Sequence, residues 1–351
     1  MMKRIYILTI SLFSSVLLTA QIDWHTTPIP EYVNQVNPND SVRKAPTKGI
    51  IIAGQGDRLR AFSMWGGGAN RDTLYAQVAN LYKKEFDSIN IYVMPIPTQG
   101  AFYCPDKAKA WTNSERKTIE TIFRYLDKDV IPINIFTTLG QHASENIYSR
   151  TDHHWAALGA YYAAEEFTRV AGLPFRDLTH YDTLSVSNYV GTMAKYSKDP
   201  TIKEYPETFY YYVPKGIDYT TTYVKYTLDK SRRLVISKSK PVEEPFFLKY
   251  PDGSRLAYCT FIGGDDRLVH VKTGTQNGRH LLILKDSFGN AIPGYLFYSF
   301  ENIHIVDCRY FTENLKTYVI QHGVTDILFA NNLSHACRVE TINSYTNYLT
   351  Q

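Results

Sequence analysis

The sequence lacks several features that would place it in a specialised class of protein. It has four cysteines in 351 residues and no CxxC pair, which argues against a zinc knuckle or a thioredoxin-like redox site. It has no run of basic residues, and its formal net charge of +4 does not give the electrostatic footprint of a nucleic-acid-binding protein. It also has no internal repeat or low-complexity segment. We therefore expect an ordinary folded protein that does not bind nucleic acid.

Long apolar runs are scarce as well. The run at residues 5–18 follows two basic residues and precedes small residues up to Ala20. This order is typical of a secretory signal peptide, and the run is shorter than the roughly 20 residues that a membrane-spanning helix needs. We expect residues 1–20 to be a signal peptide and the mature chain to begin at Gln21 without a transmembrane span. The protein would then be exported, to the periplasm or out of the cell.

The cysteines leave the question of disulfide bonds open. Cys104, Cys259, Cys308 and Cys337 are widely spaced. An oxidising compartment would permit up to two disulfides, and four cysteines allow three pairings between which the sequence does not choose.

Apolar patterning predicts two α/β segments. In the first segment, short buried strands alternate with amphipathic helices in the order 49–54, 72–86, 89–95, 113–126, 130–136 and 155–171. The last of these helices should end at Gly172. The same alternation returns near the C-terminus at 280–285, 292–300, 303–306, 313–322 and 326–330. Such alternation predicts a parallel sheet covered by helices.

A β-rich insert is expected between the two segments. Tyr, Thr and Val alternate there in short runs separated by turn residues, which favours antiparallel strands. We expect residues 21–181 and 280–351 to form the two parts of one α/β core, and residues 182–279 to form the insert. The 28 tyrosines are either ordinary sheet residues or stacking surfaces for sugars. Tyr210 and Tyr212 are the candidates for substrate binding.

A first motif, Thr-Asp-His-His-Trp at 151–155, lies at the entrance to a predicted helix. In nucleophilic catalysis an aspartate orients an imidazole, and the imidazole accepts the proton of a serine hydroxyl. In a loop, Asp152 and His154 can touch. Alternatively, Asp152 only caps the helix and both histidines are exposed. A metal held by Asp152, His153 and His154 would need a partner motif such as HxxxH, which is absent, so we expect no metal.

A second motif follows the apolar strand predicted at 280–285. The polar turn Asp-Ser-Phe-Gly at 286–289 places Ser287 at the carboxyl end of this strand, where open α/β sheets bind their ligands. The alternative is that Asp286 and Ser287 form only a capping turn. Two motifs of this kind at strand and helix edges together meet the requirements of a Ser-His-Asp triad.

These motifs resemble the DHHW protein family, which is related to the SGNH-hydrolase-like alginate O-acetyltransferases of the bacterial periplasm. The resemblance rests on Asp-His-His-Trp at 152–155, Asp-Ser-Phe-Gly at 286–289 and Met-Pro-Ile-Pro-Thr-Gln-Gly at 94–100. It implies an SGNH-like three-layer α/β/α fold with a mostly parallel sheet and a β-rich insert. It also implies that the Asp-x-His block precedes the serine block, as it does here.

The resemblance also assigns roles to residues. Ser287 matches the nucleophile, His154 the base and Asp152 the acid that orients it. Lys285 stands where a glycine precedes Asp-Ser in the GDS form of the serine block, which puts the shape of the turn in doubt. The oxyanion donors implied are the Gly289 N–H or the side chain of Asn331 or Asn332.

The expected function is therefore an exported serine enzyme that transfers or removes an O-acyl group, with acetyl as the first candidate. Its substrate would be a glycan or acylated carbohydrate of the cell envelope or the extracellular space. It would need no cofactor and no metal, and a membrane-bound acyl-delivery protein is a candidate partner. The alternative is a non-catalytic glycan-binding or polysaccharide-assembly protein on the same fold.

Overall fold

The computed structural model describes residues 22–351, so the signal peptide expected at 1–20 lies outside the described residues. Within the described part, none of the helices combines the length and the apolar character needed to cross a bilayer. All four cysteines are free, and three of them are buried. The disulfides that the sequence left open are therefore not formed in this structure.

A nine-stranded sheet forms the centre of the molecule. Its strands are β4 (Asn90–Val93), β5 (Val130–Pro132), β8 (Tyr219–Leu228), β9 (Val235–Lys238), β10 (Val242–Glu243), β11 (Arg267–Thr273), β12 (His280–Lys285), β13 (Asn302–Asp307) and β14 (Asp326–Ala330). They lie in the order β10, β8, β11, β13, β12, β14, β4, β5, and β9 pairs with β8. The pairings from β13 to β5 are parallel, whereas those among β8, β9, β10, β11 and β13 are antiparallel. The sheet is therefore mixed, and the expectation of a mostly parallel sheet is corrected.

The mixed character has a simple origin. Strand β11 of the expected insert pairs antiparallel with β13, and it carries β8, β9 and β10 beyond it. The insert thus extends the central sheet, whereas β6 (Tyr181–Tyr189) and β7 (Glu207–Pro214) form a separate two-stranded antiparallel sheet. Whether residues 182–279 are a domain of their own stays a prediction.

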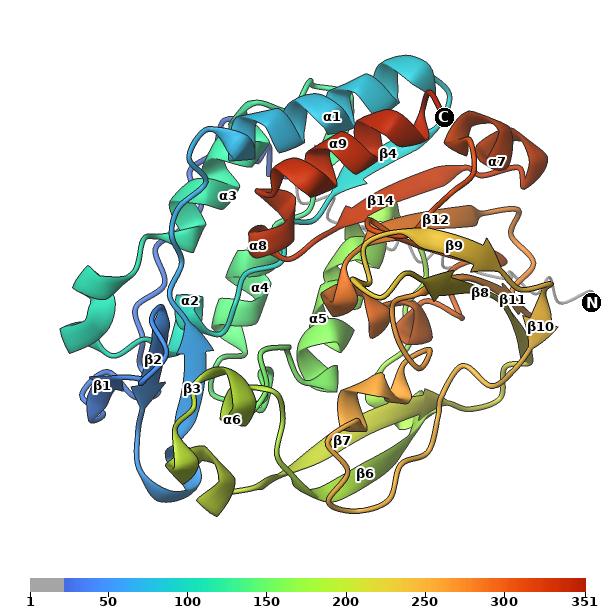
Figure 1. Cartoon of the computed structure of the whole chain (residues 1–351). Helices are drawn as coiled ribbons and strands as arrows, with labels where there is room; N and C mark the ends of the chain where they lie inside the picture. Colours follow the sequence, from blue (N-terminus) through green and yellow to red (C-terminus); the bar gives the residue numbers. More distant parts are fainter. Residues whose placement is uncertain (1–21) are drawn as a thin grey trace, which may run out of the picture.

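Helices cover both faces of the parallel half of the sheet (Figure 1). The helices are α1 (Arg71–Glu85), α2 (Gly100–Tyr103), α3 (Glu115–Arg124), α4 (Ile135–Gln141), α5 (Ala157–Ala171), α6 (Met193–Tyr196), α7 (Leu315–Gln321), α8 (Leu333–Ala336) and α9 (Val339–Tyr348). On one face, Phe329 of β14 contacts Tyr82 of α1 and Tyr345 of α9, at ring distances of 4.9 and 5.3 Å. On the other face, Tyr92 of β4 contacts Phe167 of α5 at 5.2 Å. Strands buried on both faces read as continuous apolar runs, which explains why β12 and β14 are predicted from the sequence.

Three expected elements differ from the structure. The strand predicted at 130–136 is β5, which ends at Pro132, and helix α4 begins at Ile135. The strand predicted at 49–54 is β2 (Ile50–Ala53), but it pairs with β1 (Val42–Lys44) and β3 (Arg60–Ser63) in a separate antiparallel sheet. The helix predicted at 292–300 is only a 3₁₀ turn, Pro293–Tyr295. Gly294 packs so closely there that an added Cβ would lie 2.8 Å from the Phe247 ring. The turn therefore packs directly against Phe247, which only a residue without a side chain permits at this position.

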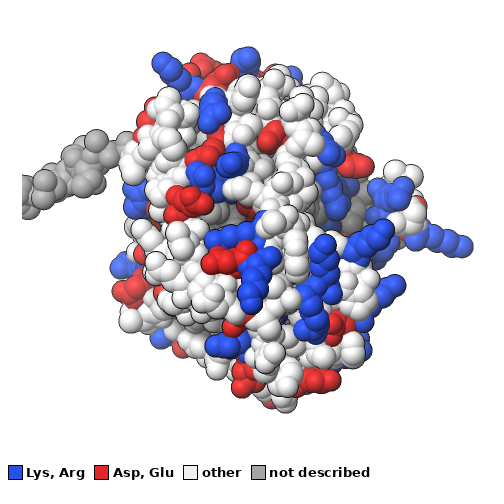
Figure 2. Space-filling model, turned by 90° about the vertical axis from the view of Figure 1, so that its left-hand side faces the viewer, with Lys and Arg blue, Asp and Glu red and all other residues white. Residues whose placement is uncertain are grey.

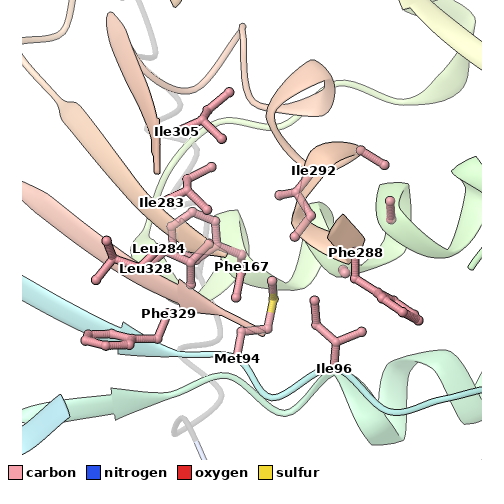
Figure 3. Close-up of a cluster of buried hydrophobic side chains, with 14 of the residues drawn as sticks. Met94, Ile96, Phe167, Ile283, Leu284, Phe288, Ile292, Ile305, Leu328 and Phe329 are labelled. Carbon is pink, nitrogen blue, oxygen red and sulfur yellow. The ribbon is translucent and has the colours of Figure 1, made fainter. Parts of the chain in front are cut away.

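The largest apolar cluster joins the sheet to the turn that follows β12. Figure 3 shows Ile283 and Ile305, from neighbouring strands, gathered with Phe167 of α5 and with Phe288 and Ile292. All five side chains are buried. Because interiors are packed as densely as crystals, this contact gives the turn at Ser287 a rigid base.

The joined sheet predicts that the insert and the core unfold together. Leu268 of β11 is 6% exposed, and its change to Ala should lower the free energy of unfolding by about 2–5 kcal/mol in a single transition. The matched change Ile236→Ala, on exposed β9, should cost less than about 0.5 kcal/mol. Chemical denaturation followed by both fluorescence and circular dichroism would measure these effects. Two separate transitions, with only one shifted by Leu268→Ala, would contradict a joint sheet.

Candidate active site

Ser287 lies in a short turn at the carboxyl end of β12. Asp286 caps this 3₁₀ turn, because its Oδ1 accepts the Phe288 N–H at 2.9 Å. Its Oδ2 accepts the Asn332 N–H at 2.6 Å, which ties the turn to the end of β14. Ser287 lines a cavity of about 470 Å³ at this edge of the sheet.

A chain of hydrogen bonds joins the two sequence motifs. His154 Nε2 lies 2.8 Å from Ser287 Oγ, and His154 Nδ1 lies 2.6 Å from Asp152 Oδ1. An ionised carboxylate only accepts hydrogen bonds, so Nδ1 carries the proton and Nε2 accepts the Ser287 hydroxyl. The structure therefore brings these three side chains together. Asp152 and His154 are both buried, so the bond between them is shielded from water.

The carboxylate of Asp152 is held from two sides. Its Oδ2 accepts the Thr192 N–H at 2.7 Å and the Thr192 hydroxyl at 2.9 Å. Gly191 makes this approach possible, because a Cβ at that position would lie 2.4 Å from Asp152 Cβ. Burial alone would raise the pKa of Asp152, but His154 and these hydrogen bonds hold it well below its ordinary value. Asp152 therefore stays ionised beside the imidazole.

Tyr258 fixes the plane of the His154 ring. The two rings are stacked, with centroids 3.8 Å apart and an interplanar angle of 6°. The Tyr258 hydroxyl lies 2.9 Å from the Phe288 carbonyl oxygen, to which it donates, and it accepts the Trp155 indole N–H at 3.2 Å. Burial raises the pKa of Tyr258 well above its ordinary value, so the hydroxyl keeps its proton. No motif in the sequence indicates Thr192 or Tyr258, because both lie in the insert at no regular spacing from either motif.

His153 lies in the wall of the cavity beside His154. Desolvation and the neighbouring imidazole lower the pKa of His153 to about 4, so it is neutral near pH 7. The ligand atoms of Asp152, His153 and His154 lie within 4.8 Å of one another, so these residues are the group that could hold a metal. However, both Asp152 oxygens and both His154 nitrogens are already engaged in the hydrogen bonds described above. A metal would have to break this chain.

Lys285 is fully buried and does not line the cavity. Its Nζ lies 2.8 Å from Asp307 Oδ2 and 3.7 Å from Asp265 Oδ1. Arg309 pairs with the same two carboxylates, at 2.7 and 3.0 Å. Burial alone would raise the pKa of Asp265, but Lys285 and Arg309 hold it below its ordinary value. The glycine of this turn is Gly289 instead, where a Cβ would lie 2.4 Å from Lys285 Cβ.

The three expected oxyanion donors are largely occupied. The Gly289 N–H donates to the Asp286 carbonyl at 3.0 Å. The Asn331 amide nitrogen donates to Asp286 Oδ2 at 3.5 Å, its oxygen accepts the hydroxyls of Tyr75 and Tyr345, and the side chain is fully buried. Asn332 does line the cavity, but its amide donates to the Ile96 carbonyl at 3.2 Å.

The two expected substrate-binding tyrosines lie elsewhere. Neither Tyr210 nor Tyr212 is among the residues that line the cavity at Ser287. Tyr210 is 48% exposed on β7, whereas the Tyr212 ring faces Tyr295 at 6.5 Å. The aromatic residues of the cavity wall are Phe62, Tyr196 and Phe288.

A buried acid supports the loop on the other side of the cavity. The carboxylate of Glu115 accepts the N–H and the hydroxyl of Thr98, at 2.6 and 2.5 Å. Next to it, the Gln99 amide donates to the carbonyls of Ala61 and Asp152. Burial raises the pKa of Glu115 to about 7. Thr98 and Gln99 both line the cavity, so Glu115 anchors this wall.

The fold and the site together define an α/β protein whose serine, histidine and aspartate are hydrogen-bonded in series at the carboxyl edge of a sheet. The model of the DHHW protein family matches residues 55–306, which include both motifs. The chain therefore belongs to the DHHW protein family. No curated protein matches its sequence.

Solved structures agree with this assignment. A DHHW family protein from Eubacterium siraeum is 34% identical, with 90% of this chain and 99% of that chain covered and a TM-score of 0.78. PatB1 from Bacillus cereus, solved with a sulfonyl adduct, is 17% identical, with 86% and 98% covered and a TM-score of 0.62. The likeness to PatB1 is one of fold.

The buried ion pair of Lys285 and Asp307, next to the serine turn, predicts a loss of stability when one partner is removed. Lys285→Met should lower the free energy of unfolding by about 3 kcal/mol, because it leaves buried carboxylates short of one positive charge. Adding Asp307→Asn should recover part of this loss. Chemical denaturation of the two single variants and the double variant gives the coupling energy. A loss below about 1 kcal/mol in Lys285→Met would contradict a structural role for this pair.

The raised pKa of Glu115 predicts that the stability of the fold depends on pH. Its pKa of about 7 in the folded chain lies above the ordinary value of about 4.3, so the folded protein binds more protons between these values. Its stability should therefore fall as the pH rises from 4 to 8, by on the order of 3 kcal/mol from this group. Glu115→Gln keeps a donor and an acceptor for Thr98 and should remove this fall.

The comparison needs a control for the loss of one charge. Glu31→Gln makes the same change at an exposed carboxylate. Denaturation midpoints of the three proteins at pH 4, 6 and 8 give the result. Parallel pH profiles for wild type and Glu115→Gln would show that the buried acid does not titrate in this range.

Proposed function

We propose that this protein uses Ser287 as a nucleophile to transfer or remove an O-acyl group, acetyl above all, on a glycan. The observation that carries the proposal is the hydrogen-bond chain from Asp152 through His154 to Ser287 Oγ. Nucleophile, base and orienting acid within hydrogen-bond distance are the signature of this chemistry. The chain opens onto a cavity of about 470 Å³, which is within the range of small-molecule sites.

The first half-reaction forms an acyl-enzyme. Ser287 Oγ attacks the carbonyl carbon of the acyl donor, and its proton passes to His154 Nε2. The alcohol of the donor leaves and takes that proton. Asp152 stabilises the imidazolium that exists between these two transfers. The Ser287 N–H is the favoured oxyanion donor, because the first amides of a helical turn have no partner within the turn.

The second half-reaction releases the acyl group. A sugar hydroxyl or water gives its proton to His154 and attacks the acyl carbonyl, and Ser287 Oγ leaves and regains the proton. Transfer and hydrolysis thus use the same groups and differ in the acceptor. Export and an SGNH-like catalytic fold belong to the same proposal, and the fold shared with PatB1 supports the latter.

Substitution of the three residues tests the proposal. Ser287→Ala, His154→Ala and Asp152→Asn should each lower kcat/KM for p-nitrophenyl acetate by about 10⁴-fold, since the three groups act as one unit. The double variant Ser287→Ala/His154→Ala should be no worse than Ser287→Ala alone. The matched controls Ser237→Ala, at an exposed position, and His180→Ala, at a half-buried position outside the cavity lining, should keep wild-type activity.

Covalent labelling provides an independent measurement. Phenylmethylsulfonyl fluoride should add one sulfonyl group to the wild type and none to Ser287→Ala, as read by peptide mass spectrometry. Purified protein that neither turns over an acetyl ester nor is labelled at Ser287 would contradict the proposal. It would favour a glycan-binding protein without catalysis.

A further inference from the structure

A second cavity opens beside the catalytic one. It has a volume of about 430 Å³, and it is lined by residues that follow β8 and β13 and by the start of α9. Arg309, His335 and Arg338 line both cavities, so the two meet at these three side chains. Ser287 lines only the first. A ligand longer than one acyl ester could therefore extend from the serine into the second cavity.

The second cavity is strongly positive. Four arginines line it, namely Arg232, Arg233, Arg309 and Arg338, against one carboxylate, Glu340. Figure 2 shows many Lys and Arg side chains on the right-hand half of the face drawn. Such an excess attracts negatively charged ligands.

The positive charge is only partly neutralised. Arg309 is paired with Asp307 and Asp265, and Arg232 lies 3.3 Å from Asp266. In contrast, neither Arg233 nor Arg338 has a carboxylate within 4 Å among residues 22–351. These two guanidinium groups keep their donors for a ligand. Guanidinium binds carboxylate, phosphate and sulfate through two parallel hydrogen bonds.

A second observation points to a polar ligand at the junction. His335 Nδ1 is buried and has no hydrogen-bond partner among the described residues. Buried polar atoms are nearly always paired, so an unpaired one indicates a place for a bound group or water. His335 lies between the two cavities, where a ligand that spans them would pass.

We propose that the second cavity is a subsite for an anionic substituent of the glycan, and that the substrate is therefore an acidic glycan. That the ligand is a glycan rests on the proposed function. That the cavity binds an anion does not depend on it. The acyl group reacts at Ser287, and a carboxylate or phosphate on a neighbouring sugar binds Arg233 and Arg338. The site thus selects among glycans by charge.

Binding to the inactive Ser287→Ala protein tests the subsite without any reaction. The probes are trigalacturonate, its methyl ester and a maltotriose phosphate, titrated in a calorimeter. At least one anionic probe should bind about tenfold or more tightly than the neutral ester, the size expected for one charge-assisted hydrogen bond. The preference should weaken as salt is raised. Binding of the carboxylate but not the phosphate, or the reverse, identifies the anion.

Substitutions then locate the site. Arg233→Gln/Arg338→Gln in the Ser287→Ala background should abolish the preference for the anionic probe. Arg124→Gln, an exposed arginine of α3, makes the same charge change elsewhere and should leave the preference intact. Circular dichroism checks that each variant is folded. Equal binding of anionic and neutral probes, or a preference that survives the double substitution, would overturn the proposal.

Turnover separates this inference from the proposed function. With active Ser287, the ratio of KM for the methyl ester to KM for trigalacturonate as acyl acceptors should be about ten or more, and near one in the double arginine variant. If Ser287 is never acylated while the anionic probe still binds through Arg233 and Arg338, the proposed reaction fails and the subsite stands. If acylation proceeds without any charge preference, the subsite fails and the reaction stands.

Discussion

The site depends on two hydrogen bonds that the carboxylate of Asp286 accepts. This carboxylate is fully buried, and it accepts the Phe288 N–H within its own turn and the Asn332 N–H at the end of β14. It therefore fixes the serine turn and the neighbouring strand end to each other. Removing such a buried acceptor would leave these donors unpaired, which costs more than the net value of one hydrogen bond. The orientation of Ser287 toward His154 follows from this contact.

Residues far apart in the sequence complete the site. The imidazole comes from the loop before α5, whereas the tyrosine stacked on it and the threonine that holds its aspartate both come from the insert. The insert thus contributes directly to the position of the base. The insert is itself fixed to the core, because its strand β11 pairs with β13 of the central sheet.

Much of this arrangement follows from the sequence. The apolar run at 280–285 predicts β12, and Gly172 predicts the end of α5. The two motifs contain Ser287, His154 and Asp152, the three side chains that meet in the structure. The alternation of strands and helices also predicts the parallel pairing of β4, β5, β12, β13 and β14. It does not predict that β11 of the insert pairs antiparallel with β13, because nothing in the pattern of either strand names its neighbour. The buried ion pair of Lys285 does not follow from the sequence either. Its partner Asp307 lies on the next strand of the sheet, and no pattern within either strand links them.

The free thiols have a chemical consequence of their own. Burial raises the pKa of Cys104 and of Cys259 to about 11 and that of Cys337 to about 12, so the thiolate is a minute fraction at neutral pH. Oxidation and disulfide exchange both proceed through the thiolate. The folded chain should therefore persist in an oxidising medium with its cysteines reduced, because the same apolar packing that holds the sheet together keeps them inert.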